Sequence, residues 1–249
     1  MPSYSLVKKS QARYTQERKD AQMFALLLAA TLNIGVYYTY PPESIVLHNA
    51  NGKEIAVKTK IDIREAINAI LNQAEAIINK EIFDNKSAIK FKLAFTKQWN
   101  IKNPPIYKDI NIPHAVDVAK IWPLVDELER PAEADVYITL FRPALAYFDS
   151  KEGRMKGAAG VAYGNLYFGQ QMALQIGLGT PASDGDVSLL LHELGHLLDQ
   201  GHPSEKLCAE TKIIMCPRGR VSIVLDELYK KAWHDFYYQK TGQGFKPSQ

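Results

Sequence analysis

Two histidines and a glutamate lie close together in one stretch of the chain, at a spacing that suits metal chemistry. His192 and His196 are four residues apart, so on a helix their imidazoles lie on one face, one turn apart. Two imidazoles at that separation can bind one Zn²⁺ at about 2.0–2.1 Å. Glu193 is rotated by about 100° from His192, which places it beside the ion, where it can take a proton from water on the metal. The spacing therefore predicts a zinc site that activates water.

Two residues compete for the position of third ligand. Asp199 continues the same helical face, but a straight helix carries it about 4.5 Å beyond His196. A chain that leaves the helix near residues 199–200 and turns back at Gly201 brings His202 to the ion instead. Spacing alone leaves both residues open, with Asp199, the less comfortably placed of the two, as the reserve ligand.

The whole motif and a downstream methionine resemble one family of zinc enzymes. Residues 192–202 read HExxHxxxxxH, which resembles the metzincin metalloproteases, whose pattern is HExxHxxGxxH. Asp199 stands at the position of the glycine, and aspartate tolerates the left-handed backbone conformation better than most residues. The turn that His202 requires is therefore feasible. Met215, in the fragment Ile-Met-Cys-Pro, resembles the Met-turn of the reprolysin-like branch, which also places a cysteine near this turn.

The resemblance implies a zinc-dependent endopeptidase with a catalytic domain like those of reprolysins and matrixins. The zinc ligands that it implies are His192, His196 and His202. Glu193 would act as general base and then as proton donor, and Met215 would form a hydrophobic floor beneath the ligands. The floor tyrosine that some branches place two residues after the methionine is Pro217 here, so no contribution from such a tyrosine is expected.

A short segment before the metal-binding helix has the features of a substrate-binding strand. Gly160-Val161-Ala162-Tyr163 resembles the antiparallel edge strand that borders the active cleft in metzincins. There, unpaired backbone groups would bind an extended protein or peptide substrate by strand addition. A plain hairpin of the core fits the same residues.

The helix that carries the two histidines has a clear start and a clear buried face. Ser183, with Asp186 three residues on, has the form of a capping box in which aspartate replaces the usual glutamate. The apolar positions expected to pack against a sheet are Val187, Leu190, Leu191, Leu194 and Leu198. A last amphipathic helix over residues 221–240 is placed behind the zinc site, as in metzincin domains.

Upstream of this helix, strand and helix patterns alternate. Asp62 is a plausible N-cap for a helix with an apolar stripe, and Pro123 is expected to kink or split a helix over residues 115–129. Strands are expected over residues 89–95 and 136–140, after a hairpin over residues 44–60 whose turn is Asn51-Gly52. The alternation predicts an α/β (α+β) fold in which helices connect the strands of one sheet.

The resemblance adds detail to this fold. It implies a mixed five-stranded twisted sheet with an antiparallel edge strand, two long helices, a Met-turn and a C-terminal helix. The metalloprotease-like domain would span residues 61–241, after a linker and hairpin over residues 41–60. The polar residues 242–249 are expected to form a flexible tail.

An apolar run over residues 21–40 has the length of a membrane-spanning helix, about 20 residues. The lysines and arginines of residues 1–20 predict a cytoplasmic N-terminus, so the run is interpreted as a transmembrane signal anchor with the catalytic domain outside. Two alternatives are a cleaved signal peptide, which would give a secreted protein, and a core or partner-binding helix of an intracellular protein.

Composition limits the partners and the number of cross-links. The 249 residues carry a net charge of +3 with dispersed basic residues, which does not favour nucleic acid as a partner. The two cysteines, Cys208 and Cys216, can form one disulfide in an oxidising compartment. The other histidines, His48, His114 and His234, are not expected to be ligands.

One alternative function belongs to a different class. A zinc-stabilised but catalytically inactive binding module would keep the three histidines and have lost hydrolysis, with Asp199 at the glycine position as the sign of that loss.

Overall fold

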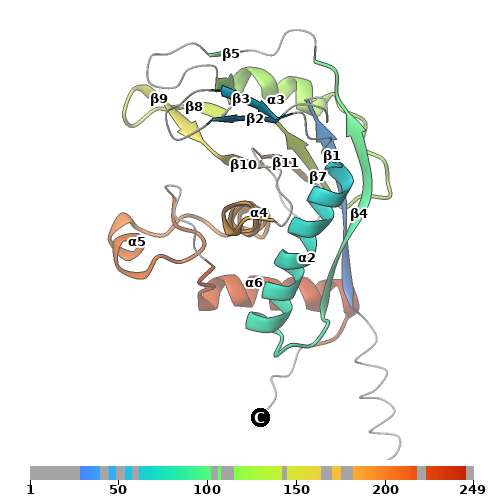
Figure 1. Cartoon of the computed structure of the whole chain (residues 1–249). Helices are drawn as coiled ribbons and strands as arrows, with labels where there is room; N and C mark the ends of the chain where they lie inside the picture. Colours follow the sequence, from blue (N-terminus) through green and yellow to red (C-terminus); the bar gives the residue numbers. More distant parts are fainter. Residues whose placement is uncertain are drawn as a thin grey trace, which may run out of the picture.

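The computed structural model builds the chain from two larger sheets, a hairpin and several helices (Figure 1). The residues that it describes are 29–39, 45–48, 54–57, 62–101, 106–107, 115–141, 145–163, 170–174, 182–217 and 223–244.

A five-stranded sheet forms the centre of the fold. Its strands are β1 (Ala30–Tyr38), β4 (Ile89–Gln98), β7 (Val136–Leu140), β10 (Gly160–Tyr163) and β11 (Gln170–Leu174). The strand order is β10-β11-β7-β1-β4. Neighbouring strands are parallel except β10, which is antiparallel to β11 and lies at one edge. The predicted mixed α/β class is therefore confirmed.

The apolar run that was predicted to span a membrane contains the middle strand of this sheet. Residues 30–38 form β1, which pairs with β4 on one side and β7 on the other. Among the described residues, no helix is both long enough and apolar enough to cross a bilayer. The predicted transmembrane anchor over residues 21–40, and the location that followed from it, are therefore wrong.

The physical reason is that β1 is covered on both faces. A central parallel strand has no solvent-facing side, so its residues are apolar without alternation and read like a membrane segment. Val36 belongs to the main core, and Tyr37, on the opposite face, packs with Ala134 and Tyr137 in a second cluster.

Helix α2 (Ile63–Ile82) packs along one face of the sheet. Asp62 caps it as predicted, because its carboxylate accepts hydrogen bonds from the backbone N–H groups of Arg64 and Glu65. At the far end, the buried Asn79 joins the helix to β4: its Oδ1 accepts from the N–H groups of Ala88 and Ile89. The main core lies between the sheet and the helices α2, α4 (Asp184–Leu197) and α6 (Glu227–Thr241).

A second, four-stranded sheet was not predicted. It consists of β5 (Ile106–Tyr107), β6 (Ala115–Asp117), β8 (Leu145–Asp149) and β9 (Arg154–Ala158) in the order β5-β6-β8-β9. The helix expected over residues 115–129 is therefore shorter, since its first residues form β6. Asp117 accepts a hydrogen bond from the N–H of Ala119 and so caps helix α3 (Val118–Asp126), which contains Pro123.

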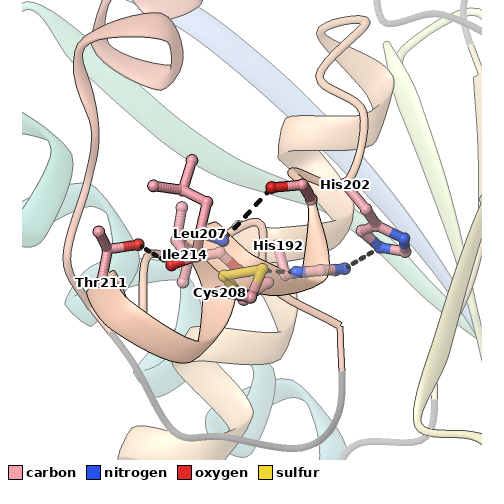
Figure 2. Close-up of a disulfide and its surroundings, with 8 residues drawn as sticks. His192, His202, Leu207, Cys208, Thr211 and Ile214 are labelled. Atoms are coloured by element: carbon pink, nitrogen blue, oxygen red, sulfur yellow. Dashed lines mark hydrogen bonds between the residues drawn. A yellow bond between two sulfur atoms is a disulfide. The ribbon is translucent and has the colours of Figure 1, made fainter.

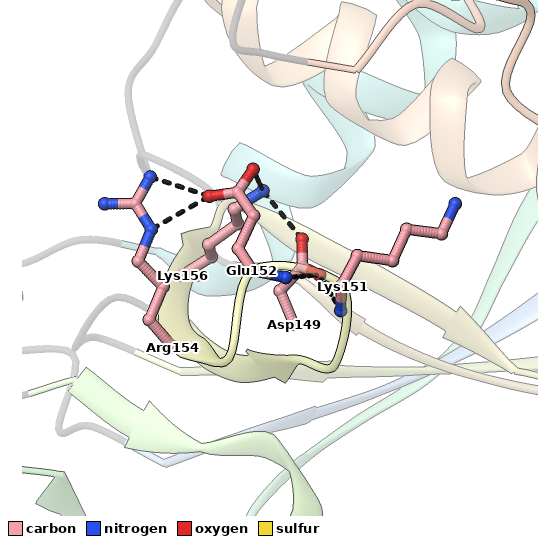
Figure 3. Close-up of polar contacts among 5 residues, drawn as sticks. All are labelled: Asp149, Lys151, Glu152, Arg154 and Lys156. Carbon is pink, nitrogen blue, oxygen red and sulfur yellow. Dashed lines mark hydrogen bonds and ion pairs between the residues drawn. The ribbon is translucent and has the colours of Figure 1, made fainter.

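The hairpin β8–β9 leads the chain into the edge strand β10, and charged side chains brace its turn (Figure 3). Lys156 forms ion pairs with Asp149 at 2.6 Å and with Glu152, which also pairs with Arg154 at 2.7 Å. Hydrogen bonding from Lys156, together with backbone N–H groups of the turn, lowers the pKa of Asp149 to about 2. Only Ala159 separates β9 from β10. The ion pairs that fix the turn between β8 and β9 therefore also fix the strand that leads into β10.

The remaining elements include the expected two-stranded hairpin, β2 (Ile45–His48) with β3 (Glu54–Val57). Its turn lies outside the described residues, as do residues 1–28 and most of the predicted tail. In Figure 1, helix α4 is seen end-on between β10 above it and α6 below it, with α5 (Glu205–Thr211) to its side.

Candidate metal centre

Helix α4 carries two of the three histidines and is capped as the sequence predicts. The Ser183 hydroxyl accepts a hydrogen bond from the N–H of Asp186 and donates to its carboxylate at 2.7 Å. The apolar face of the helix, including Leu190 and Leu194, is buried in the main core. His192 and His196 consequently point away from that core, one turn apart.

The structure brings three imidazoles to one point. The Nε2 atoms of His192 and His196 are 3.1 Å apart, and the Nε2 atom of His202 lies 3.1 Å from the first and 3.0 Å from the second. In the described part of the chain, these three histidines form the one group of at least three metal-ligating side chains whose donor atoms converge. Asp199, the reserve ligand, is not part of it.

Hydrogen bonds to backbone carbonyls decide which ring nitrogens face each other. Nδ1 of His192 lies 2.7 Å from the carbonyl oxygen of Ile214, and Nδ1 of His196 lies 2.7 Å from that of Gln200. A carbonyl only accepts, so each Nδ1 carries the proton and each Nε2 presents a lone pair. Metal-binding histidines commonly use this arrangement.

These lone pairs fit a small divalent cation. Nitrogen atoms about 3 Å apart can each lie about 2.0–2.1 Å from one Zn²⁺, whereas two unprotonated nitrogens at that distance have no hydrogen to share. Burial lowers the pKa of His192 to about 4 and also lowers the pKa values of His196 and His202. The rings are therefore neutral at pH 7, as ligands must be.

The turn after α4 brings His202 back to the helix. Asp199 has a φ of 59°, in the left-handed region, and Gly201 does not have a positive φ. The N–H of Gln200 donates to the carbonyl of Gly195, and the N–H of Asp199 to that of His196. This is the Schellman pattern of helix ends, with aspartate at the position usually taken by glycine. The chain thus reverses at Asp199 rather than at Gly201.

Met215 lies directly beneath the helix. A Cβ added to Gly195 would lie 2.3 Å from the Met215 sulfur and 2.8 Å from a ring carbon of Tyr229. Met215 is only 2% exposed, and the Tyr229 hydroxyl donates to the carbonyl of Leu191 at 2.7 Å. Sequence reasoning missed the roles of Gly195 and Tyr229, although a glycine inside a helix is unfavourable enough to be a signal of close packing.

A disulfide ties this floor to helix α5. Cys208 forms a disulfide with Cys216 (Figure 2). In the sequence, Cys216 directly follows Met215. The cross-linked segment includes Ile214, whose carbonyl holds His192. Ile214 is fixed from the other side as well, because its N–H donates to the carbonyl of Val224 at 2.8 Å.

Glu193 lies between α4 and the edge strand β10. Its side chain is almost fully buried, and burial raises its pKa to about 8, although a hydrogen bond from the N–H of Ala162 acts in the opposite direction. In the described part of the chain, its Oε2 has no hydrogen-bond partner. A buried carboxyl group, with one oxygen unpaired among the described residues, therefore lies one residue from the first of the converging histidines.

No protein-family model and no curated protein matches the chain. Among solved structures, the crystal structure of metalloproteinase-II from Bacteroides fragilis is similar with a TM-score of 0.44 and 15% identity. The match covers 87% of this chain and 55% of that one, so the chain spans about half the length of that protein. A likeness this distant does not bear on the chemistry of the site.

The other predicted residues fall outside the three-histidine group. His234 lies on α6, where its ring packs edge-on against Phe83 at 4.9 Å. His114 lies outside the described residues, and His48 is in β2. The segment Gly160–Tyr163 forms the edge strand β10, which is antiparallel to the next strand of the chain, β11. This pairing fits both the substrate-binding edge strand that the resemblance implied and a plain hairpin, so the binding role stays a prediction.

Proposed function

We propose that this chain is a zinc-dependent endopeptidase. One observation carries the proposal: three imidazole nitrogens converge within 3.1 Å of one another, beside a buried glutamate, under the open edge of a sheet. Each part has a separate use in peptide hydrolysis, and together they match the metzincin resemblance of the motif.

The three imidazoles would hold the metal. His192 and His196 are already oriented by the carbonyls of Ile214 and Gln200, so little freedom is lost when the ion binds. A bound zinc ion would supply Lewis-acid activation of a water molecule and of the substrate carbonyl. Met215 supports the helix from below and excludes water from that side.

Glu193 would move the proton. Burial raises its pKa in the metal-free protein, and a cation bound by the neighbouring imidazoles would favour its ionised form. The ionised carboxylate would take a proton from the attacking water and deliver it to the leaving amine. The Ala162 N–H and the wall of β10 would keep the carboxylate at the place where that transfer occurs.

Strand β10 would bind the substrate. Among the described residues, β10 pairs with β11 alone, so an extended peptide could add to its other edge as a further strand, apart from the Ala162 N–H, which bonds to Glu193. Such binding depends on backbone hydrogen bonds, so peptides with N-methylated amides next to the scissile bond are expected to be cleaved more slowly.

The inactive binding module has lost its main support. It rested on Asp199 in place of glycine, and Asp199 takes the left-handed conformation that the turn requires, with both hydrogen bonds of the helix end formed. The departure from the family pattern is thus compatible with an intact site.

The test is metal content and cleavage of denatured protein by the purified chain. We expect stoichiometric zinc, cleavage that a chelator stops and zinc restores, and loss of activity in Glu193→Gln with zinc retained. General base catalysis is commonly worth about 10²–10⁴-fold, so the loss should be at least that large. Glu210→Gln, on the exposed surface of α5, is the matched control and should behave like the wild type. Zinc binding without any cleavage of an unfolded protein would favour the binding module instead.

A further inference from the structure

One glycine of the edge strand makes the room in which Glu193 lies. A Cβ added to Gly160 would lie 2.3 Å from Oε1 of Glu193, 2.8 Å from its Cδ and 2.9 Å from its Cγ, and these are the three nearest heavy atoms. Gly160 does not have a positive φ, so its backbone does not require glycine. The absence of a side chain at position 160 is needed for space.

The carboxylate is enclosed at this place. Glu193 is 3% exposed, and its carboxylate accepts a hydrogen bond from the N–H of Ala162, two residues along the same strand. Alternate residues of a strand point to the same face, so Gly160 and Ala162 both face helix α4. Ala162 packs against the main core, and α4 contacts β10 along this line. The strand therefore covers Glu193 and also bonds to it.

We propose that Gly160 is a positioning residue for Glu193. Because it has no side chain, β10 can pass close over the carboxylate and hold it beside the three imidazoles. The catalytic consequence rests on the proposed function, but the contact does not. The end of a glutamate side chain can rotate, so a methyl group at position 160 would displace the carboxylate and leave the fold and the histidines in place.

The first test is kinetic, with Gly160→Ala compared with Gly157→Ala. Gly157 lies in the preceding strand β9, where an added Cβ meets only the carbonyl oxygen of Leu145 at 4.0 Å. Misplacing a catalytic group by about 1 Å can cost about 10²-fold, so Gly160→Ala should lower kcat by about that factor. KM, zinc content and melting temperature should match those of Gly157→Ala. Equal kcat values for the two variants would overturn the proposal.

The second test does not need activity. In a crystal structure of zinc-loaded Gly160→Ala, the Glu193 carboxylate should have left the Ala162 N–H while the three imidazoles superpose on those of the wild type. A carboxylate that stays on the Ala162 N–H would overturn the proposal. If the wild type hydrolyses no peptide, the proposed function fails, and this structure still decides whether Gly160 positions Glu193.

A double variant covers the case in which Gly160→Ala does not fold. Glu193→Ala removes the atoms that the new methyl group would meet, so Gly160→Ala with Glu193→Ala should fold with the melting temperature of Gly157→Ala with Glu193→Ala. A double variant that also fails to fold would show that Gly160 is needed by the fold itself, which would contradict the proposal.

Discussion

The converging histidines come from two regions that are built in different ways. His192 and His196 project from a regular helix, half-buried, and each ring is held by a backbone carbonyl. His202 follows the turn at Asp199 and is exposed. The helix pair is arranged by the period of the helix, whereas His202 depends on one residue in the left-handed conformation. The first two histidines are thus positioned by the helix and by backbone carbonyls, and the third by the turn of the backbone.

The two regions also differ in how tightly they are packed. Under the helix, a side chain at Gly195 would meet Met215 and Tyr229, whereas a side chain at Gly201, next to His202, would meet nothing within 4 Å. We therefore expect the helix region to tolerate almost no change and the turn region to tolerate changes that keep the reversal of the chain.

The largest expected effect is on metal affinity. His192→Ala and His202→Ala should each weaken zinc binding by more than the roughly 10–100-fold typical of losing a group that only orients a ligand. Asp199→Asn is the control, since asparagine accepts the left-handed conformation and removes the carboxylate, and its affinity should be unchanged. Competition with a chromophoric chelator measures all three. Zinc affinity that survives His202→Ala and falls in Asp199→Asn would make Asp199 the third ligand.

The next largest effect is on stability. Gly195→Ala should lower the free energy of unfolding of the metal-free protein by about 1–3 kcal/mol, because overpacking outweighs the better helix propensity of alanine. Gly201→Ala should change it by less than about 0.5 kcal/mol. Urea denaturation of the two variants measures the difference, and equal values would contradict the close packing of Met215 and Tyr229 against the helix.

A smaller effect is expected at the turn itself. Asp199→Ala should cost about 1 kcal/mol, because alanine is less tolerant of a φ near 59° than aspartate, whereas Asp199→Gly should cost nothing. Zinc affinity should follow the same order, with the alanine variant weaker. An alanine variant as stable as the wild type would mean that the turn does not depend on the residue at this position.

The last effect concerns acid and is spread over a range of pH. The pKa of His192 in the folded protein is about 4, below its ordinary value of 6.5, so protons bind the unfolded chain first. Stability of the metal-free protein is thus full above pH 6.5 and falls as the pH drops from 6.5 towards 4. Over this range we expect the melting temperature to fall by about 2–4 °C for each kcal/mol of unfolding free energy that is lost. This fall should be smaller in His192→Ala than in His202→Ala. A larger fall in His192→Ala than in His202→Ala would mean that His202, at the turn, is the more strongly buried of the two histidines.

Much of the site could be read from spacing, because regular elements have regular periods. The apolar stripe of α4 and the four-residue separation of His192 and His196 follow from 3.6 residues per turn, and the cap at Ser183 follows from the unpaired N–H groups at a helix start. The reversal at Asp199 could be judged feasible from the tolerance of aspartate for the left-handed region. Contacts between distant segments could not be read in this way, so the close approaches at Gly160 and Gly195 were missed.

The main error concerned β1, and its cause is physical. A strand buried on both faces, a core helix and a membrane helix all bury apolar residues without a polar side, so composition does not separate them. Positions 30–38 include β-branched and aromatic residues, such as Ile34, Val36 and Tyr37, and this composition was the feature of the sequence that indicated a strand. Strand β6 was missed for a related reason, since Ala115–Asp117 is too short for its period to register.

The position of β1 also bears on how the protein is made. Asn33, in this strand, hydrogen-bonds to Asp135, 102 residues further along the chain, and β1 pairs with β4 and β7 on its two sides. A ribosome adds about 5–20 residues per second, so β1 waits several seconds for its second neighbour. The apolar strand β1 is therefore exposed, and prone to aggregation, during synthesis. A fragment that begins at residue 44 would lack β1 and with it the strand that joins β4 to β7.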